Sequence, residues 1–402
     1  MGVLEGKKIL LGITAGIAAY KTASLVRLFI KAGAQVQVIM TPASKDFITP
    51  LTLSTLSKKE VISSFTNEED ENATWNNHVE LGLWADFMLI APATANTLSK
   101  MASGTSDNVL LAIYLSAKCP VYFAPAMDLD MYKHPATKTS LETLQSYGNI
   151  MIPAESGELA SGLVGEGRMA EPENIVSFLE KDLLSQLPLR NKKILITAGP
   201  TYEAIDPVRF IGNHSSGKMG FELAKEAAKL GAEVILVTGP THLNLENSSV
   251  KIIRVTTASE MYTAVHTHFP NQDVVIAAAA VSDYKPKEVV DQKIKKKDSS
   301  LNIELVPTQD ILGSLGKIKK HQKLIGFALE TNNEVENAKS KLERKNLDFI
   351  VLNSLQDKGA GFKKDTNRIS IISEDEIKKF ELKSKSEVAQ DILKEVIYLF
   401  HE

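Results

Sequence analysis

The chain has 402 residues, 44% hydrophobic and 24% charged, with a formal net charge of −3 and one cysteine. This length favours two domains over one, and the near-neutral charge excludes a broad basic surface for nucleic acid. A single cysteine excludes an intrachain disulfide framework and a cysteine-based metal centre, which favours a cytoplasmic location.

The N-terminal half opens with a strand and a helix. Lys8 to Ile13 is an apolar strand that runs into a glycine turn, Gly12 to Gly16. A helix is predicted from Ala18 to Ala32, ended by Gly33, and Gln35 to Met40 follows as the next strand. This order predicts a parallel βαβ unit.

Two further apolar runs, Asp86 to Ala91 and Pro120 to Ala124, each end in Ala-Pro. Apolar strands that alternate with helices are typical of a parallel sheet covered on both faces. Such sheets bind ligands at the carboxyl ends of their strands. Four segments are therefore expected to converge on one site: Gly12 to Lys21, Thr41, Pro92 to Thr97 and Pro125 to Met131.

The same order returns in the second half. Lys193 to Thr197 predicts a strand and Gly199-Pro200 a turn. A helix from Gly217 to Leu230 and a strand from Glu233 to Val237 follow. The polar, lysine-rich segment Lys285 to Ser300 is expected to be a mobile flap.

The domain boundary is expected just after a helix predicted from Pro172 to Leu184. We predict a first domain at 1–186, a linker at 187–191 and a second domain at 192–402. Both are predicted to be doubly wound α/β domains with mainly parallel sheets. The longest uncharged apolar run, Val274 to Val281, is far shorter than the roughly 20 residues that span a bilayer, so no membrane partner is expected.

The first glycine turn is ambiguous by itself. Gly12-Ile-Thr-Ala-Gly16 departs from the G-x-G-x-x-G spacing, which disfavours a nicotinamide dehydrogenase. Glycines that flank a threonine at the start of a helix suit one phosphate or the edge of a ring. A tight turn without any ligand is an equally good interpretation of these five residues.

Four motifs further along favour a flavin. They are Asn77 to Gly82 (NHVELG), Ala91 to Thr97 (APATANT), Pro125 to Tyr132 (PAMDLDMY) and Gly157 to Met169 (GELASGLVGEGRM). In this order they resemble the flavin-dependent cysteine decarboxylase family. The resemblance implies a flavodoxin-like domain that binds FMN.

The second half carries another set of motifs. They are Ile196 to Thr201 (ITAGPT), Asp206 to Arg209 (DPVR), Asn213 to Met219 (NHSSGKM), Ala279 to Tyr284 (AAVSDY), Lys293 to Lys295 (KIK), Gly326 to Thr331 (GFALET) and Arg344 to Asp348 (RKNLD). They resemble phosphopantothenate-cysteine ligase, which implies a Rossmann-like ligase domain. The two halves together resemble the bacterial bifunctional enzymes of coenzyme A biosynthesis.

The resemblance implies a set of FMN contacts. Backbone amides and hydroxyls of the turns would hold the phosphate, and residues after the Asp86 strand would lie along the flavin. The implied residues are Gly12, Thr14, Gly16, Thr41, Ala93, Thr94, Asn96, Thr97 and Met127. His78 is implied as the group that acts on the substrate thiol and carboxylate, since imidazole can transfer a proton near neutral pH. Outside this family, such a histidine is more often a surface residue.

Two positions depart from the family pattern. Asp128 replaces an asparagine, so it must be protonated or rearranged to hold a substrate carboxylate. Ser161 replaces a cysteine that donates a proton, and serine is a far weaker acid. Glu158 or Asp128 are alternative donors, whereas Cys119 is expected to be a packing residue. Arg168 is expected to bind the substrate phosphate or carboxylate.

The ligase resemblance implies CTP with Mg2+, and an acyl-cytidylate on the substrate. Lys293, with Lys341 and Lys345 on one helix face, would neutralise the triphosphate, although such a pair is often only a solvated face. Asn213 would hold the acyl oxygen or simply cap a helix, and Lys218 would attract the substrate phosphate. The other implied nucleotide or substrate contacts are Arg209, Ala277, Ala278, Ala279, Asp283, Thr308, Gln309, Asp310, Ile311 and Phe327. No metal ligand is singled out.

These implications predict a bifunctional enzyme. It would ligate 4'-phosphopantothenate with L-cysteine and then decarboxylate the product to 4'-phosphopantetheine. Asp128 and Ser161 motivate an alternative, an active ligase fused to a non-decarboxylating flavin-binding assembly module. The resemblance also implies a homo-oligomer, a dodecamer built from trimeric flavin and dimeric ligase contacts, in which His78 reaches a flavin of a neighbouring subunit.

Overall fold

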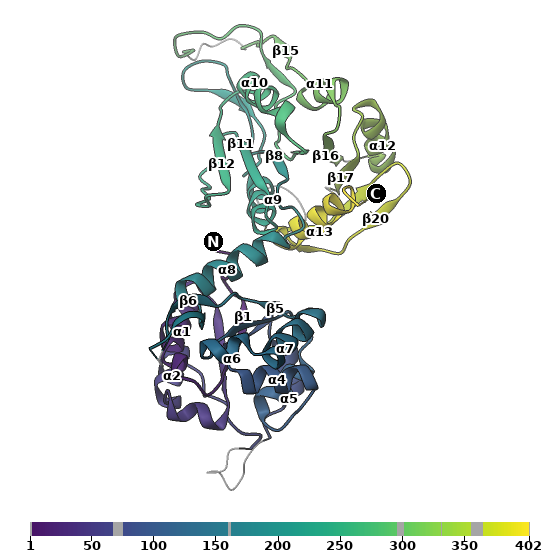
Figure 1. Cartoon of the computed structure of the whole chain (residues 1–402). Helices are drawn as coiled ribbons and strands as arrows, with labels where there is room; N and C mark the ends of the chain where they lie inside the picture. Colours follow the sequence, from purple (N-terminus) through teal and green to yellow (C-terminus); the bar gives the residue numbers. More distant parts are fainter. Residues whose placement is uncertain are drawn as a thin grey trace. The chain divides into compact units, whose positions relative to one another are not determined.

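The computed structural model describes residues 2–66, 75–159, 162–295, 301–330, 332–354 and 365–401, with Ser354 described by its backbone alone. The chain forms two compact units, Met1–Ser185 and Gln186–Glu402. Each unit is an α/β domain built on its own sheet (Figure 1). Among the helices in these ranges, none combines the length and the apolar character of a membrane span.

The sheet of the first unit has five parallel strands in the order β2-β1-β3-β4-β5. The order reverses beside β1, and ligands of such sheets bind at the carboxyl ends of strands next to a reversal. The predicted apolar runs form β1 to β4, each almost wholly buried apart from the start of β2 and β1. The strands are β1 (Lys8–Ile13), β2 (Gln35–Met40), β3 (Phe87–Ala93), β4 (Val121–Pro125) and β5 (Ile150–Met151).

Helices cover both faces of this sheet. One buried apolar cluster joins the strands to α1, α2 and α8, and another joins them to α4, α5 and α7. The helix predicted from Ala18 begins as the 3-10 turn η1, and the Thr22 hydroxyl donates to the Ala19 carbonyl at 2.6 Å where α1 starts. The elements are η1 (Ile17–Lys21), α1 (Thr22–Lys31), η2 (Pro42–Asp46), α2 (Pro50–Ser57), α3 (His78–Trp84), α4 (Ala95–Ser103), α5 (Val109–Ser116), α6 (Leu129–Lys133), α7 (Pro135–Ser146) and α8 (Pro172–Ser185).

An antiparallel hairpin of β6 (Glu155–Glu158) and β7 (Val164–Arg168) contacts the loop after β4. The Met127 amide donates to the Gly167 carbonyl at 3.0 Å. Gly167 has a φ of +132°, and a Cβ there would lie 2.5 Å from the Met127 carbonyl oxygen. Only glycine therefore allows the hairpin this close approach.

The sheet of the second unit has eight strands in the order β12-β11-β8-β13-β16-β17-β19-β20. The strands from β12 to β17 are parallel, whereas β19 and β20 are antiparallel additions at one edge. The prediction of two mainly parallel α/β domains is thus confirmed. The strands are β8 (Lys193–Ala198), β11 (Glu233–Thr238), β12 (Val250–Arg254), β13 (Val274–Ala277), β16 (Lys323–Glu330), β17 (Phe349–Ser354), β19 (Ile369–Ile372) and β20 (Ile377–Lys379).

Helices again cover two faces. α9 and α13 belong to one buried apolar cluster, and α10, α11 and α12 belong to another. The helices are α9 (Lys218–Lys229), α10 (Ala258–His268), η3 (Phe269–Asn271), α11 (Ile311–Ile318), α12 (Glu334–Arg344) and α13 (Lys385–Tyr398). Three small antiparallel pairs complete the unit: β9 (Tyr202–Ala204) with β10 (Phe210–Gly212), β14 (Tyr284–Pro286) with β15 (Leu305–Pro307), and β18 (Thr366–Asn367) with β21 (Lys383–Ser384).

Candidate active sites

A cavity of about 1000 Å³ lies at the carboxyl ends of the strands in the first unit. It is bounded by the turn after β1, the starts of α4 and α6, and the β6–β7 hairpin. This volume is at the upper end of ordinary cofactor sites. The implied residues that line it are Gly16, Thr41, Thr94, Asn96, Thr97, Met127, Asp128, Glu158 and Arg168.

Thr14 has a different place from the one expected. It is fully buried, and its hydroxyl donates to the Pro92 carbonyl at 2.6 Å. The same oxygen accepts from the Thr94 amide at 3.2 Å. Because the single hydroxyl hydrogen is used inside the protein, Thr14 fixes two turns together and cannot also donate to a phosphate.

Gly12 and Ala93 are also structural. Gly12 lies within β1, where a Cβ would be 3.1 Å from the Leu110 side chain of α5. Ala93 is fully buried, and its carbonyl accepts from the Ala126 amide at 3.0 Å. Both positions are packed inside the unit, and neither lines the cavity.

The remaining lining fits a flavin mononucleotide. Gly16 is extended, and a Cβ there would lie 3.2 Å from the Thr94 methyl group, so this turn is closely packed against the start of α4. Amides and hydroxyls of this kind suit a phosphate. Ile17, Met127 and Met131 add apolar surface suited to an aromatic ring.

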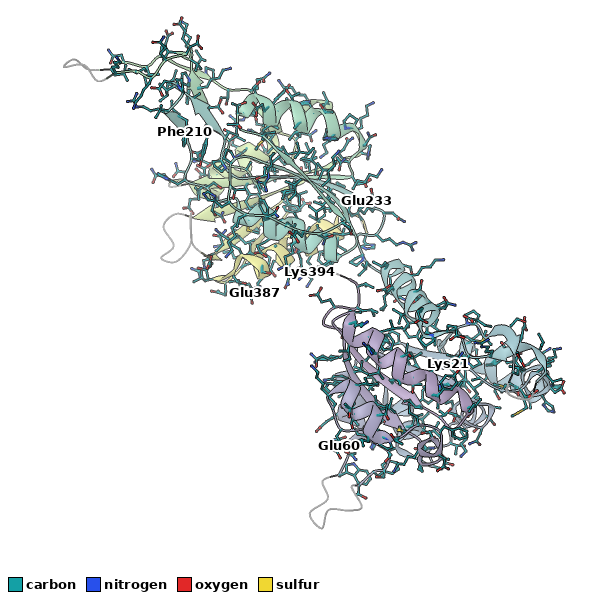
Figure 2. All side chains as sticks on the ribbon, turned by 90° about the vertical axis from the view of Figure 1, so that its left-hand side faces the viewer. Lys21, Glu60, Phe210, Glu233, Glu387 and Lys394 are labelled. Carbon is teal, nitrogen blue, oxygen red and sulfur yellow. The ribbon has the colours of Figure 1, made fainter. Side chains whose placement is uncertain are left out.

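The cavity also holds a charged group that sequence reasoning passed over. Lys21 is buried, and its ammonium lies 2.9 Å from the Glu171 carboxylate and 3.2 Å from the Met169 carbonyl (Lys21 is labelled in Figure 2). Arg168 binds the same carboxylate. The hydrogen bond from Lys21 holds the pKa of Glu171 below its usual range. In the sequence, Lys21 is marked only as the end of the Gly12 to Lys21 segment expected at this site.

The candidate proton donors differ in their places. Asp128 precedes α6 without making a capping hydrogen bond, and it lines the cavity together with Glu158. Cys119 does not line it, and burial raises the pKa of its thiol. Cys119 packs beside the apolar cluster of α4 and α5. Ser161 lies outside the described residues.

His78 is the first residue of α3 and does not line the cavity of its own chain. Its Nδ1 atom is buried and has no hydrogen-bond partner among the described residues. The imidazole meets the rings of Phe65 and Trp75 edge-on, with centroids 6.4 Å away in both cases. The ring is therefore held by aromatic packing, with one nitrogen unsatisfied.

The second unit has a smaller pocket of about 150 Å³ at the start of α9 and the ends of β13, β16 and β17. Four of its lining residues were implied by the sequence: Lys218, Ala278, Ala279 and Phe327. The lining also includes Ser215 and Ser216 from the NHSSGKM motif, the strand-end residue Asn353, and two residues to which the sequence assigns no role, Asn367 and Lys385. The last two are contributed by the C-terminal part of the chain, where no motif was recognised.

A second polar cluster forms where α11 and α12 meet. The Lys341 ammonium donates to the Phe327 carbonyl at 2.8 Å, and Lys345 binds Asp310 at 2.8 Å. Burial, followed by the charge of Lys345, lowers the pKa of Lys341. The Thr308 amide donates to the Asp283 carbonyl at 2.9 Å. Gln309 and Ile311 flank Asp310 in the chain. Ala277 is the last residue of β13.

Two expected ligase residues are engaged within the protein. Asn213 donates to the carbonyls of Ala280 and Val281 at 3.0 and 3.1 Å, so both of its amide hydrogens are used and no donor is left for an acyl oxygen. Arg209 binds buried Asp206 at 2.7 Å and the Ile294 carbonyl at 3.1 Å.

Arg209 thereby anchors the lysine-rich segment and does not line the described pocket. Lys293 in that segment is exposed, and residues 296–300 are outside the described ranges. Within the described residues, no three His, Cys, Asp or Glu side chains are grouped so as to hold a metal ion.

Two units with mainly parallel sheets, the first with a cofactor-sized cavity at the carboxyl ends of its strands, have the architecture of a flavoprotein domain joined to a second α/β domain. The model of the family "Flavoprotein" matches residues 2–184, and that of the "DNA/pantothenate metabolism flavoprotein C-terminal domain" matches residues 189–399. A coenzyme A biosynthesis bifunctional protein CoaBC from Bacillus subtilis is 44% identical over 99% of this chain and 98% of its own. The chain belongs to the family of these bifunctional coenzyme A biosynthesis proteins.

The chain is also similar to a further curated relative and to a solved structure. A cysteine/cysteine sulfinic acid decarboxylase from an unknown prokaryotic organism is 55% identical over 88% of this chain and 100% of its own. A crystal structure of the C-terminal domain of CoaBC is 46% identical and covers 54% of this chain and 99% of its own, with a TM-score of 0.46.

Proposed function

We propose that this chain joins 4'-phosphopantothenate to L-cysteine at its C-terminal unit and decarboxylates the product to 4'-phosphopantetheine at its N-terminal unit. The observation that carries this proposal is the pair of separate sites, one in each unit, in a chain whose bifunctional relatives align with it almost end to end. Decarboxylation is part of the family's role, so a flavin module without that activity is not favoured.

In the N-terminal unit, the turn at Gly16 and the hydroxyls of Thr41 and Thr97 would hold FMN. When bound, FMN would supply the oxidising and reducing chemistry of the decarboxylation. Lys21 and Arg168 place positive charge on the cavity wall, where it would orient a substrate anion. Asp128, Glu158 or Ser161 would hold the proton for the product, and the β6–β7 hairpin would exclude water.

In the C-terminal unit, CTP would activate the phosphopantothenate carboxylate, with Mg2+ bound to the triphosphate. Lys341, Lys345 and Lys293 would neutralise developing negative charge. The small residues Ala278 and Ala279 let a nucleotide approach the backbone at the end of β13. Lys218, at the start of α9, would attract a phosphate.

The assembly is also a proposal. His78 lies off the cavity lining of its own chain, which supports a role at the flavin of a neighbouring subunit. Trimeric flavin contacts and dimeric ligase contacts would together give a cytoplasmic dodecamer. Mass measurement of the purified full chain by sedimentation tests this directly.

Each half-reaction can be tested on the full chain. With 4'-phosphopantothenate, cysteine and CTP, we expect pyrophosphate release, and with phosphopantothenoylcysteine alone, carbon dioxide release. Pyrophosphate without carbon dioxide would leave only the ligase. Substitution of CTP by ATP tests the nucleotide, and flavin extraction identifies the cofactor.

Free cysteine is a second candidate substrate for decarboxylation, because one relative at 55% identity is named for cysteine and cysteine sulfinic acid. Phosphopantothenoylcysteine is larger than cysteine and carries a phosphate, which cysteine lacks. Competition between cysteine and phosphopantothenoylcysteine in the carbon dioxide assay separates them. We expect a kcat/KM at least about 100-fold higher for the phosphorylated substrate, since its remote groups supply binding energy.

A further inference from the structure

The pocket at the start of α9 contains a lysine, Lys385, whose charge is expected to destabilise the folded chain. Lys385 is the first residue of α13, is only 7% exposed and lines the pocket. Its ammonium makes no hydrogen bond or ion pair with any other described residue. Desolvation of an unpaired ammonium is costly, and a cation at a helix N-terminus is unfavourable as well.

The surroundings add to this cost. Lys218 is the first residue of α9 and lines the same pocket, so a second cation and a second helix N-terminus face Lys385. Burial and the charge of Lys218 lower the pKa of Lys385. Two carboxylates lie nearby, and the charge of Asp365 offsets part of this cost because it raises the pKa of Lys385. Asp365 is 84% exposed and binds Lys218 at 2.6 Å, and Glu387 is bound to Ser384 in a capping box.

A polar pair completes the wall. Asn367 is 3% exposed and donates to the Asn353 side-chain oxygen at 2.9 Å, while its own Oδ1 has no partner among the described residues. Rotation of these two amides exchanges nitrogen and oxygen, so the pair can present a donor to the pocket. The volume of about 150 Å³ admits a phosphoryl group and is smaller than the sites that enclose a whole ligand.

We propose that Lys385 and Asn367 complete a phosphoryl-binding subsite with Lys218 and the N-terminus of α9. A dianion at this place offsets the repulsion between two ammonium groups and two helix N-termini. The subsite rests on the proposed ligase function, whose phosphorylated ligands are the phosphopantothenate monoester and the nucleotide triphosphate. Both offer the same chemistry, and binding measurements distinguish them.

The test measures binding of 4'-phosphopantothenate, pantothenate, CTP and pyrophosphate to the full chain by calorimetry. Lys385→Met should weaken one phosphorylated ligand by about 10- to 100-fold, the loss of one charge-assisted hydrogen bond. Pantothenate affinity should stay unchanged. If phosphopantothenate weakens and CTP does not, the monoester occupies the subsite, and the reverse pattern assigns the triphosphate.

The matched control is Lys394→Met, an exposed lysine on the same helix, labelled in Figure 2. It should bind every ligand as the wild type does. Lys385→Met should also keep or raise the melting temperature, since it removes an unpaired and partly desolvated charge. Equal affinities in wild type and Lys385→Met, or a lower melting temperature without any change in affinity, would overturn the subsite. If Lys385→Met loses pyrophosphate binding and the wild-type chain shows no ligation, the subsite stands and the proposed function is rejected.

Discussion

The Lys21 ammonium lies 2.9 Å from the Glu171 carboxylate, although 150 residues separate them in the chain. Arg168 binds the same carboxylate from the end of β7. A single acid thereby links the turn after β1 to the hairpin that borders the cavity. Any change of charge at Glu171 therefore affects both walls of the candidate flavin site.

Glu171→Gln should lower the stability of the N-terminal unit at neutral pH by about 1 kcal/mol, a value reduced by solvent screening of this partly exposed pair. Because the folded-state pKa of Glu171 is depressed, its stabilisation is present above about pH 4.3 and is lost as the pH falls through the folded pKa. Urea unfolding at pH 7 and pH 3 measures this. The variant should approach wild type at pH 3, whereas Glu142→Gln, an exposed control on α7, should match wild type at both.

His78→Asn should reduce carbon dioxide release by about 100-fold or more and leave pyrophosphate release unchanged. His78 lies off the cavity of its own chain and is expected to act on a substrate at a neighbouring flavin site. His134→Asn is the matched control, because His134 only caps α7 and asparagine caps equally well. Full decarboxylase activity in His78→Asn would remove this residue from the mechanism.

Gly167→Ala should displace the β6–β7 hairpin, since its Cβ would lie 2.5 Å from the Met127 carbonyl oxygen at a φ of +132°. We expect a loss of about 1–3 kcal/mol in stability and a lower flavin content per chain, measured by absorbance. Gly148→Ala tests strain alone, because its φ is +87° and no atom lies within 4 Å of a Cβ there. Equal flavin content in the two variants would contradict the role of the hairpin.

Lys341→Met should raise the KM for CTP by about tenfold while changing stability by less than about 1 kcal/mol. The pKa of Lys341 is lowered mainly by burial, so its charge destabilises the fold below that pKa, and this penalty disappears as the pH rises toward 10. Removal of the ammonium offsets the lost bond to the Phe327 carbonyl. Steady-state kinetics with Lys339→Met as the exposed control on α12 checks this, and an unchanged KM would place CTP elsewhere.

Sequence patterns were sufficient for the fold class and for the general location of the first site. The segments Lys8–Ile13 and Gln35–Met40 agree with the strands residue for residue, because a parallel strand covered on both faces is mostly apolar and mostly buried. The carboxyl ends of these strands converge for the same geometric reason. The motifs then indicated the family.

The tertiary structure decided what individual side chains do. Thr14 and Asn213 carry the expected functional groups, but their hydrogens are used by Pro92, Ala280 and Val281. Lys385 lies in the ligase pocket although no local motif marks it. Hydrogen-bond partners and buried charges depend on contacts between residues far apart in the chain, and periodicity records only which face of an element is apolar.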